Sequence, residues 1–205
     1  MVYYIKNLCY TGKKTWEYMY MPDNKTRTEK MLLCAMFTAL ITIGAFIRIP
    51  LPLIPSTLQY FMTVLAGMLL GGKLGALSVL AYLGLGLAGL PVFSGGGGLG
   101  YIVKPTFGYL LSFAAGTFVT GYLSASAGTN IRRLLTAALA GMLIVYSGGT
   151  AYCWLIYRFY LQQAIGFWPL LLSCVIMPLP KDILLCWLAA FLAKKLKPLI
   201  GWSVS

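Results

Sequence analysis

The sequence contains no histidine and four acidic residues among its 205 positions, against sixteen lysines and arginines. The acidic residues are Glu17, Asp23, Glu29 and Asp182, and charged residues make up 10% of the chain. A soluble domain carries about 25% charged residues, and a chain this short cannot bury a 60% hydrophobic composition inside a water-soluble fold. The scarcity of charge therefore excludes an ordinary soluble enzyme, a disordered chain and a disulfide-stapled secreted domain. It predicts an integral membrane protein.

Ligands for a metal are equally scarce. Without histidine, and with one acidic residue after position 30, a catalytic metal centre has almost nothing to hold it. The cysteines are odd in number, widely spaced and form no C-x-x-C pair, which argues against a zinc site or a disulfide framework; they are Cys9, Cys34, Cys153, Cys174 and Cys186. We expect no metal and no cofactor.

Two glycine-rich stretches resemble nucleotide-binding loops but lack their requirements. Residues 67–74 nearly spell a phosphate-binding loop, except that Leu74 stands where Ser or Thr would hold magnesium. Residues 95–100 match G-x-G-x-x-G but join two apolar segments instead of a strand and a helix. The net charge is +12, and most of the lysines and arginines lie between apolar runs. This placement indicates contact with anionic lipid headgroups and not with nucleic acid.

Apolar runs dominate what is present. A membrane-spanning helix needs about 20 residues, and the sequence predicts an all-α integral membrane protein of six such helices. Residues 1–30 are expected to form a cytoplasmic extension, 31–197 the membrane domain and 198–205 a cytoplasmic tail. The stretch 162–178, bounded by Pro169 and Pro178, is expected to be a short interfacial or re-entrant helix. The six helices are expected at 31–48, 57–71, 74–91, 106–127, 133–156 and 180–197, with a tight hairpin at residues 71–73.

The distribution of Lys and Arg predicts the orientation. With the N-terminus inside, the inner segments hold nine of these residues and the outer segments three, Arg48, Lys104 and Arg158. Cytoplasmic loops carry the excess of positive charge. We therefore expect a multi-pass protein of the cell membrane with both termini in the cytoplasm.

Small residues recur at helix-packing spacing in Ala35-x-x-x-Ala39 and Gly67-x-x-x-Gly71. Such pairs let helix backbones approach closely in lipid, where no hydrophobic force drives helices together. Packing within the bundle is the favoured interpretation of each pair.

Asp182 is the sharpest local signal, because an ionisable residue within a membrane segment is costly and marks a candidate functional site. It follows Pro178 and Pro180, so it lies at the start of the last helix, where a carboxylate can also cap backbone N–H groups. Capping and ligand binding carry equal weight here. As a ligand contact, Asp182 would accept hydrogen bonds from donors of a polar ligand, while Lys181 or Lys104 neutralises an anionic end.

Other polar and glycine residues leave alternatives open. Gln59 faces either a pocket or a partner helix, and Tyr82 lines a pocket or fills the core. The glycine run 95–98 is either a lid over a pocket or a floppy loop, and the aromatic and hydroxyl residues on both sides of it favour the lid.

Four segments in order resemble the BioY family, the biotin-specific substrate-binding subunits (S components) of energy-coupling factor transporters. They are Leu53-Ile-Pro-Ser-Thr-Leu-Gln59, Leu69-Leu-Gly-Gly-Lys-Leu-Gly-Ala-Leu-Ser78, Gly89-Leu-Pro-Val-Phe-Ser-Gly-Gly-Gly-Gly98 and Pro105-Thr-Phe-Gly-Tyr-Leu110. The resemblance covers roughly residues 31–197.

This resemblance implies a six-helix S component that binds biotin near the outer face. The loop between the first two helices and the glycine-rich loop would close over the site. Ala35 and Ala39 would contact a transmembrane coupling protein, and two ATPase subunits would supply energy. The implied biotin-binding residues are Asp182, Lys181, Gln59, Tyr82, Phe93, Gly96, Gly97, Lys104 and Tyr109.

Two departures from the family pattern leave the partner of the substrate carboxylate open. The last helix of the family commonly opens with Pro-Gly-Asp and has a Lys three residues later; here Lys181 precedes Asp182, and Leu185 holds the later position. Lys104 and Phe107 replace usual glycines. An S component for another small vitamin is the alternative. An intramembrane enzyme is less favoured, because no Ser–Lys or Cys–Lys spacing supports one.

Overall fold

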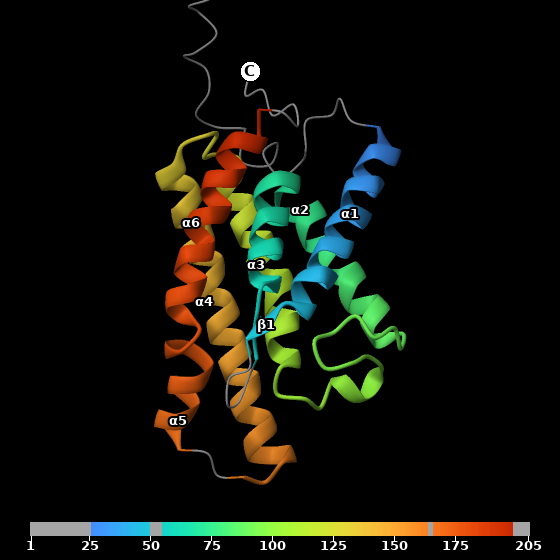
Figure 1. Ribbon diagram of the computed structural model, residues 1–205, viewed down its shortest axis with the longest axis vertical. Helices are drawn as coiled ribbons and strands as arrows, with labels where there is room; N and C mark the ends of the chain where they lie inside the picture. Colours follow the sequence, from blue (N-terminus) through green and yellow to red (C-terminus); the bar gives the residue numbers. More distant parts are fainter. Residues whose placement is uncertain (1–25, 50–54, 164–165, 199–205) are drawn as a thin grey trace, which may run out of the picture.

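The computed structural model describes residues 26–49, 55–163 and 166–198, and this part of the chain is a helical bundle with one small β-hairpin (Figure 1). The elements are α1 (Arg27–Phe46), β1 (Arg48–Ile49), β2 (Ser56–Thr57), α2 (Gln59–Leu87), η3 (Leu99–Tyr101), α3 (Phe107–Ala125), α4 (Ile131–Leu155), η4 (Ile156–Tyr160), α5 (Phe167–Leu171), η5 (Leu172–Ile176) and α6 (Leu179–Leu196).

A capping box starts α1. The backbone N–H of Glu29 donates to Thr26 Oγ1 at 3.3 Å, and the backbone N–H of Thr26 donates to Glu29 Oε2 at 3.1 Å. Two backbone donors at the helix end are thereby satisfied. The helix therefore begins at Arg27, earlier than the predicted start at residue 31.

The chain reverses direction within α2 at Gly71. This residue has φ +82° and ψ 174°, a conformation that glycine adopts without a Cβ penalty. A Cβ atom placed on Gly75 would lie 2.9 Å from Cα of Gly67, whereas eight residues of continuous helix span about 12 Å. The predicted hairpin is confirmed, and residues 59–70 and 72–87 are two helices lying side by side.

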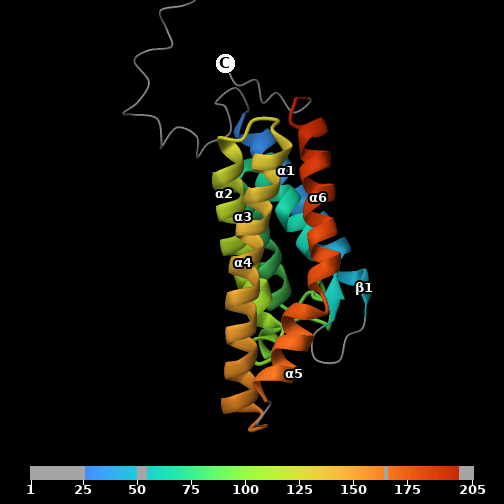
Figure 2. The same cartoon turned by 90° about the vertical axis from the view of Figure 1, so that its left-hand side faces the viewer.

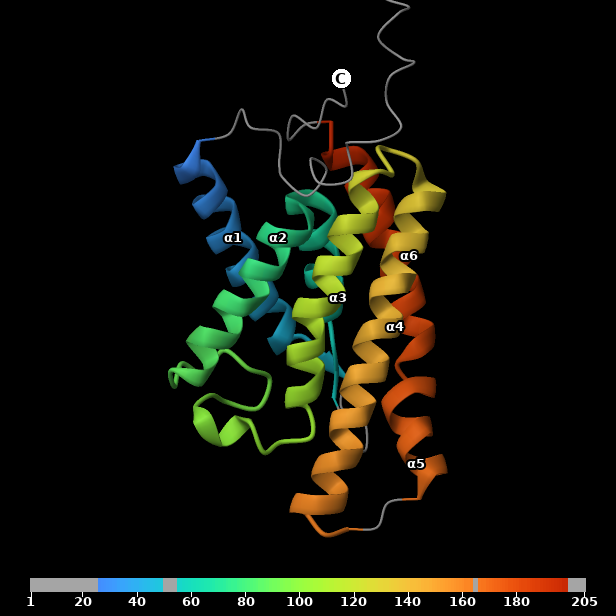
Figure 3. The same ribbon diagram turned by 180° about the vertical axis from the view of Figure 1, so that it is seen from behind.

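α3 packs between the second half of α2 and α4, as the rear view shows (Figure 3). Backbones meet closely at these contacts: Cβ atoms on Gly67 and Gly72 would lie 2.7 Å from the carbonyl oxygens of Thr117 and Phe118. Close backbone approach is how helices gain packing energy in lipid. The packing interpretation of Gly67 is therefore confirmed.

Seen edge-on, α3 and α4 lie on one side of the bundle, and α6 lies on the other beside the β1–β2 hairpin (Figure 2). Large apolar side chains fill the space between the helices; Ile41, Met68 and Leu134 are fully buried. The hairpin is antiparallel and pairs Arg48 with Thr57.

The stretch 162–178 differs from expectation. Residues 167–196 form one long helical segment, in which the π-helical turn η5 joins α5 to α6. Pro169 lies in the first turn of α5, and Pro178 and Pro180 lie at the start of α6. First-turn N–H groups have no intrahelical acceptor, so proline is tolerated there. The prediction of a separate interfacial or re-entrant helix was wrong.

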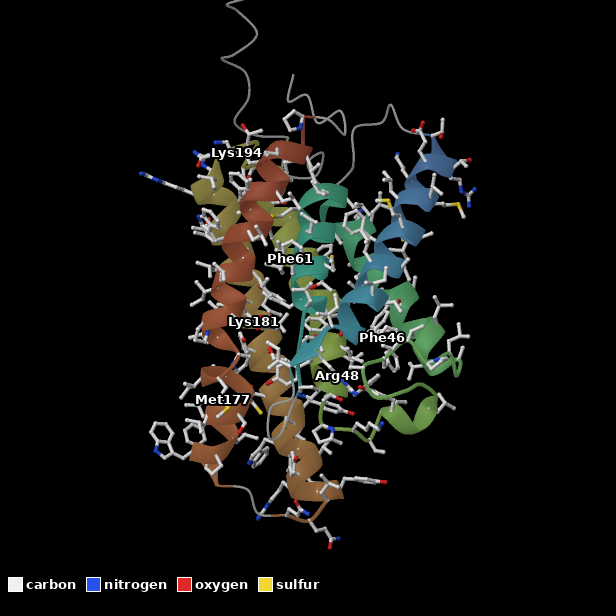
Figure 4. The ribbon with its side chains drawn as sticks, in the orientation of Figure 1. Phe46, Arg48, Phe61, Met177, Lys181 and Lys194 are labelled. Atoms are coloured by element: carbon white, nitrogen blue, oxygen red, sulfur yellow. The ribbon has the colours of Figure 1, made fainter. Side chains whose placement is uncertain are left out.

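The two ends of the bundle differ in what they carry. The start of α1, the end of α6, the Gly71 reversal and the α3–α4 connection lie at one end, with Lys194 (Figure 4). The glycine-rich loop and η4 lie toward the opposite end, and Arg48 lies in that half. Within the described residues, four helices are long and apolar enough to cross a membrane, namely 27–46, 59–87, 131–160 and 167–196.

Replacing Gly121 by Ala tests the close packing of α3 on the α2 reversal. A Cβ atom there would collide with backbone atoms of Gly71 and Gly72, which cannot yield as a flexible side chain can. We expect Gly121→Ala to destabilise the protein by about 2 kcal/mol, as overpacking does, measured as a lower melting temperature in detergent. The matched control is Gly84→Ala, because Gly84 is exposed and has open space at its Cβ position. Equal melting temperatures for the two variants would contradict this packing.

Candidate substrate-binding site

A cavity of about 70 Å³ lies between the β1–β2 hairpin, the segment around Ser94 and Tyr101, and helices α3, α4 and α6. One water needs roughly 10–15 Å³ measured in the same way, so the space admits part of a small molecule. Its wall combines aromatic rings with a few polar groups. The residues that form most of the wall are Ser56, Thr57, Gln59, Tyr60, Ser94, Tyr101, Thr106, Tyr109, Phe113, Tyr146, Ser173, Cys174, Lys181 and Asp182.

The Asp182 carboxylate occupies the α6 side of this cavity, with its side chain 10% exposed. Tyr146 on α4 donates its hydroxyl to Asp182 Oδ2 at 2.6 Å, and Lys181 Nζ lies 2.8 Å from Oδ1. A buried charge is tolerated when it is paired and hydrogen-bonded. Oδ1 is held by this ion pair but accepts no hydrogen bond of regular geometry within the described part of the chain, so it can accept from a ligand donor as well.

Asp182 does not cap α6. Pro178 is the N-cap residue and no side chain caps this end, while the backbone N–H of Asp182 itself donates to the Pro178 carbonyl at 3.0 Å. The carboxylate therefore lies in the first turn, where the helix dipole favours it, and faces the cavity. Of the two interpretations with equal weight, capping was wrong.

Lys181 connects α6 to the hairpin. Its Nζ donates to the backbone carbonyl of Thr57 at 2.7 Å, and its side chain is 26% exposed. Figure 4 shows Lys181 at the level of the β1–β2 hairpin. One cation therefore neutralises Asp182 and holds β2 against the cavity wall.

Gln59, at the first position of α2, also lines the cavity. It is 2% exposed, and its Nε2 forms no hydrogen bond of regular geometry among the described residues, although the side chain lies near the Tyr82 hydroxyl. The hydroxyl of Ser56, also in the wall, is likewise buried and unpaired there. A buried unpaired polar group costs about 1–3 kcal/mol. These groups are suited to hydrogen-bond a ligand, and the position of Gln59 in the cavity wall favours the pocket alternative for this residue.

Tyr109 contributes an aromatic wall that is fixed in place. Its hydroxyl bonds Thr150 Oγ1 at 3.1 Å and donates to the Cys174 carbonyl at 3.1 Å. Tyr60 is held by donation to the Ala138 carbonyl at 3.0 Å. Sequence reasoning missed Tyr60, Tyr101, Phe113 and Tyr146, because aromatic residues in an apolar helix carry no local signal that separates a cavity wall from core.

The glycine-rich loop is held by its own backbone hydrogen bonds, which argues against the floppy-loop interpretation. Phe93 and Gly96 exchange two backbone hydrogen bonds, at 3.0 and 3.2 Å. Gly96 has φ +114°, and a Cβ atom on Gly97 would strike the Leu90 carbonyl, so both positions require glycine.

Tyr82 and Phe93 pack on the inner side of this loop and are fully buried. Their rings pack edge-on at 5.3 Å, and Phe93 contacts Tyr101 at 4.6 Å. Tyr101 lines the cavity, whereas Tyr82, Phe93, Gly96 and Gly97 do not. Tyr82 thus belongs to the core, one of its two expected alternatives.

Lys104 lies outside the cavity wall but close to it. Its Nζ donates to the Gly95 carbonyl at 2.9 Å and lies 4.6 Å from the centre of the Tyr101 ring. Arg48 reaches the same loop and donates to the Ser94 carbonyl at 2.7 Å. Arg48 and Lys104 therefore hold the segment that borders the cavity from outside the wall, whereas Lys181 lies in the wall itself.

Ala35 and Ala39 are exposed on the outer face of α1. The residues of α1 that pack against the bundle are others, including Cys34, Phe37 and Ile41. The favoured interpretation of this pair, packing within the bundle, was wrong, because both alanines face away from it.

Comparison with known proteins agrees with this geometry. The model of the BioY family matches residues 19–201. The chain is 39% identical to a probable biotin transporter BioY of Lysinibacillus sphaericus over 82% of this chain and 87% of that protein. It is 36% identical to a biotin transporter BioY of Thermotoga maritima over 83% of this chain and 97% of that one.

Among solved structures, the fold is similar to the crystal structure of the S component for biotin from an ECF-type ABC transporter. The TM-score is 0.70 at 29% identity, covering 85% of this chain and 95% of that one. The family match spans most of the sequence, and the structural neighbour shares the bundle that surrounds the cavity. The chain belongs to the BioY family.

Proposed function

We propose that this protein is the biotin-binding S component of an ECF-type ABC transporter and takes up the vitamin across the cell membrane. The observation that carries the proposal is the paired, buried Asp182 carboxylate facing a cavity beside the unpaired amide of Gln59. The family consists of transport subunits, so the intramembrane-enzyme alternative was wrong.

The ureido ring of biotin complements this end of the cavity. Its N–H groups donate to the Asp182 carboxylate, and its carbonyl oxygen accepts from Gln59 Nε2. The thioether ring and alkyl chain lie against Tyr109, Tyr60 and Phe113, which line the wall. A mostly apolar site with a few placed polar groups is the usual form of a small-molecule pocket.

The two candidate lysines serve opposite ends of the ligand in this arrangement. Lys181 Nζ is 2.8 Å from the carboxylate that binds the ureido ring, so Lys181 balances that charge and donates to the ureido carbonyl. The valerate carboxylate is at the far end of biotin. Lys104, exposed beside the glycine-rich loop, is the cation we assign to it.

The bundle geometry supports six spans. The six helical rods are α1, the first and second halves of α2, α3, α4 continued by η4, and the continuous segment from α5 to α6. Arg132 and Arg133 lie in the first turn of α4, and Lys194 and Lys195 lie in the last turn of α6, all at the end of the bundle where α1 starts and α6 ends. By the positive-inside rule, that end is cytoplasmic and the cavity opens toward the outside.

The exposed face of α1 is proposed to contact the transmembrane coupling protein of the transporter, whose two ATPase subunits supply the energy. Ala35 and Ala39 lie one helical turn apart on this face, with Met36 and Ile43 beside them. Small residues permit close approach of a partner helix.

Lys→Gln variants, tested with biotin and with its uncharged methyl ester, distinguish the proposed roles of the two lysines. We expect Lys181→Gln to weaken binding of both biotin and biotin methyl ester by tenfold or more, because a hydrogen bond to a charged group is worth about 1.5–3 kcal/mol. Lys104→Gln should weaken biotin by about fivefold, as an exposed ion pair contributes at most about 1 kcal/mol, and leave the ester unchanged. The measurement is calorimetric titration of purified protein.

Asp182→Asn accompanies this series and should abolish binding of both compounds. The assignment fails if Lys104→Gln weakens the ester as much as biotin. The substrate proposal itself fails if the unaltered protein binds neither compound.

Enlarging Ala39 tests the coupling face. We expect Ala39→Trp to bind biotin like the unaltered protein but to lose ATP-driven uptake in vesicles that contain the complete transporter, because the bulky ring keeps the partner helix away. Ala115→Trp is the matched control, since Ala115 is an exposed alanine on α3. Equal uptake by the two variants would contradict the proposed face.

A further inference from the structure

Two cysteine thiols face each other in the wall behind the cavity. Cys174 Sγ lies 3.8 Å from Cys153 Sγ, and both residues are essentially unexposed, at 1% and 0%. Both are reduced, and with Leu170 they form a small apolar cluster apart from the main core. The other described cysteines contact hydroxyl groups instead: Cys34 faces Ser78, and Cys186 faces Tyr60.

The pair joins the same two helical segments that hold the ligand site together. Cys153 is on α4, two turns beyond Tyr146, and Cys174 is in η5, two turns before Asp182. The Tyr146–Asp182 hydrogen bond and the thiol pair are therefore successive links between antiparallel helices. Cys174 also lines the cavity and accepts the Tyr109 hydroxyl through its carbonyl.

We propose that Cys153 and Cys174 are a redox-sensitive modification site, which closes to a disulfide that braces α4 against the helix carrying Asp182. A disulfide bond is about 2.05 Å long, so the sulfur atoms, now 3.8 Å apart, must approach by about 1.8 Å. Rotation of a cysteine side chain about its Cα–Cβ bond covers a movement of this size.

The reaction needs a two-electron thiol oxidant, such as the azo compound diamide. The thiol of Cys174, reached through the cavity, adds across the N=N bond, and one nitrogen takes its proton. The Cys153 sulfur then attacks Cys174 Sγ, forms the S–S bond and displaces the nitrogen, which takes the second proton. Two thiols become one disulfide, and the azo compound is reduced to a hydrazine.

The expected consequence is a stiffer cavity wall. A covalent link between α4 and η5 restrains the helices that carry Tyr146 and Asp182 from separating, so the carboxylate stays in position for the ligand. The brace should raise thermal stability by itself, since a disulfide constrains the unfolded chain. It should also slow biotin dissociation, a consequence that rests on the proposed function.

Diamide treatment of the full-length protein in lipid nanodiscs tests the proposal. We expect oxidation to remove two alkylatable thiols, with a Cys153–Cys174 linked peptide in the mass spectrum, to raise the melting temperature by several degrees, and to slow release of radiolabelled biotin several-fold. Dithiothreitol should reverse all three changes. Cys153→Ser and Cys174→Ala should abolish them, while Cys34→Ser, a buried cysteine outside the pair, should retain them.

Each failure has a separate meaning. Unchanged alkylation, or a linked peptide that joins other cysteines, overturns the modification site. A Cys153–Cys174 disulfide that changes neither melting temperature nor release overturns the brace. If the reduced protein binds no biotin, the proposed function is contradicted. The thiol count and the melting temperature then still test whether Cys153 and Cys174 form a stabilising disulfide.

Discussion

The burial of one carboxylate governs the arrangement of this protein. Asp182 lies among apolar helices, where an unpaired charge is strongly disfavoured, so the Tyr146 hydroxyl and the Lys181 ammonium must stay beside it. Tyr146 belongs to α4, and Lys181 also holds the Thr57 carbonyl of β2. Satisfying a single charge therefore fixes α4, α6 and the hairpin around one cavity, which the paired carboxylate faces.

The loops over the cavity are held by the same type of bond, from a cationic side chain to a backbone carbonyl. Arg48 and Lys104 donate to adjacent carbonyls of Ser94 and Gly95. Behind them, Phe93 and Tyr82 form a buried aromatic support. The glycine-rich loop is thus positioned by cations that lie outside the cavity wall.

Sequence reasoning succeeded where a residue type is improbable in its setting. Asp182 stands out as the lone acid of the apolar region, and Gly71-Gly72 marks the reversal because a left-handed backbone favours glycine. The resemblance to BioY added the family, which the comparisons show. Sequence reasoning could not distinguish Tyr82, a core residue, from Tyr146, a cavity residue. Both are tyrosines in apolar helices, and the difference between them arises from tertiary packing.

Proline also misled the prediction for residues 162–178. Pro169 and Pro178 suggested a separate short helix, yet both lie at positions where a helix start or a π-helical turn leaves their missing N–H unneeded. The start of α1 was available in the sequence as Thr26-Arg-Thr-Glu29, a capping box that was not used.

A structure of the protein with biotin bound tests the central claim most directly, through the distance from the ureido nitrogens to the Asp182 carboxylate. The account predicts at least one nitrogen within about 2.7–3.2 Å of a carboxylate oxygen, with the ring enclosed between α4, α6 and the hairpin. A biotin molecule whose ureido ring lies outside this cavity, or points away from Asp182, would contradict it.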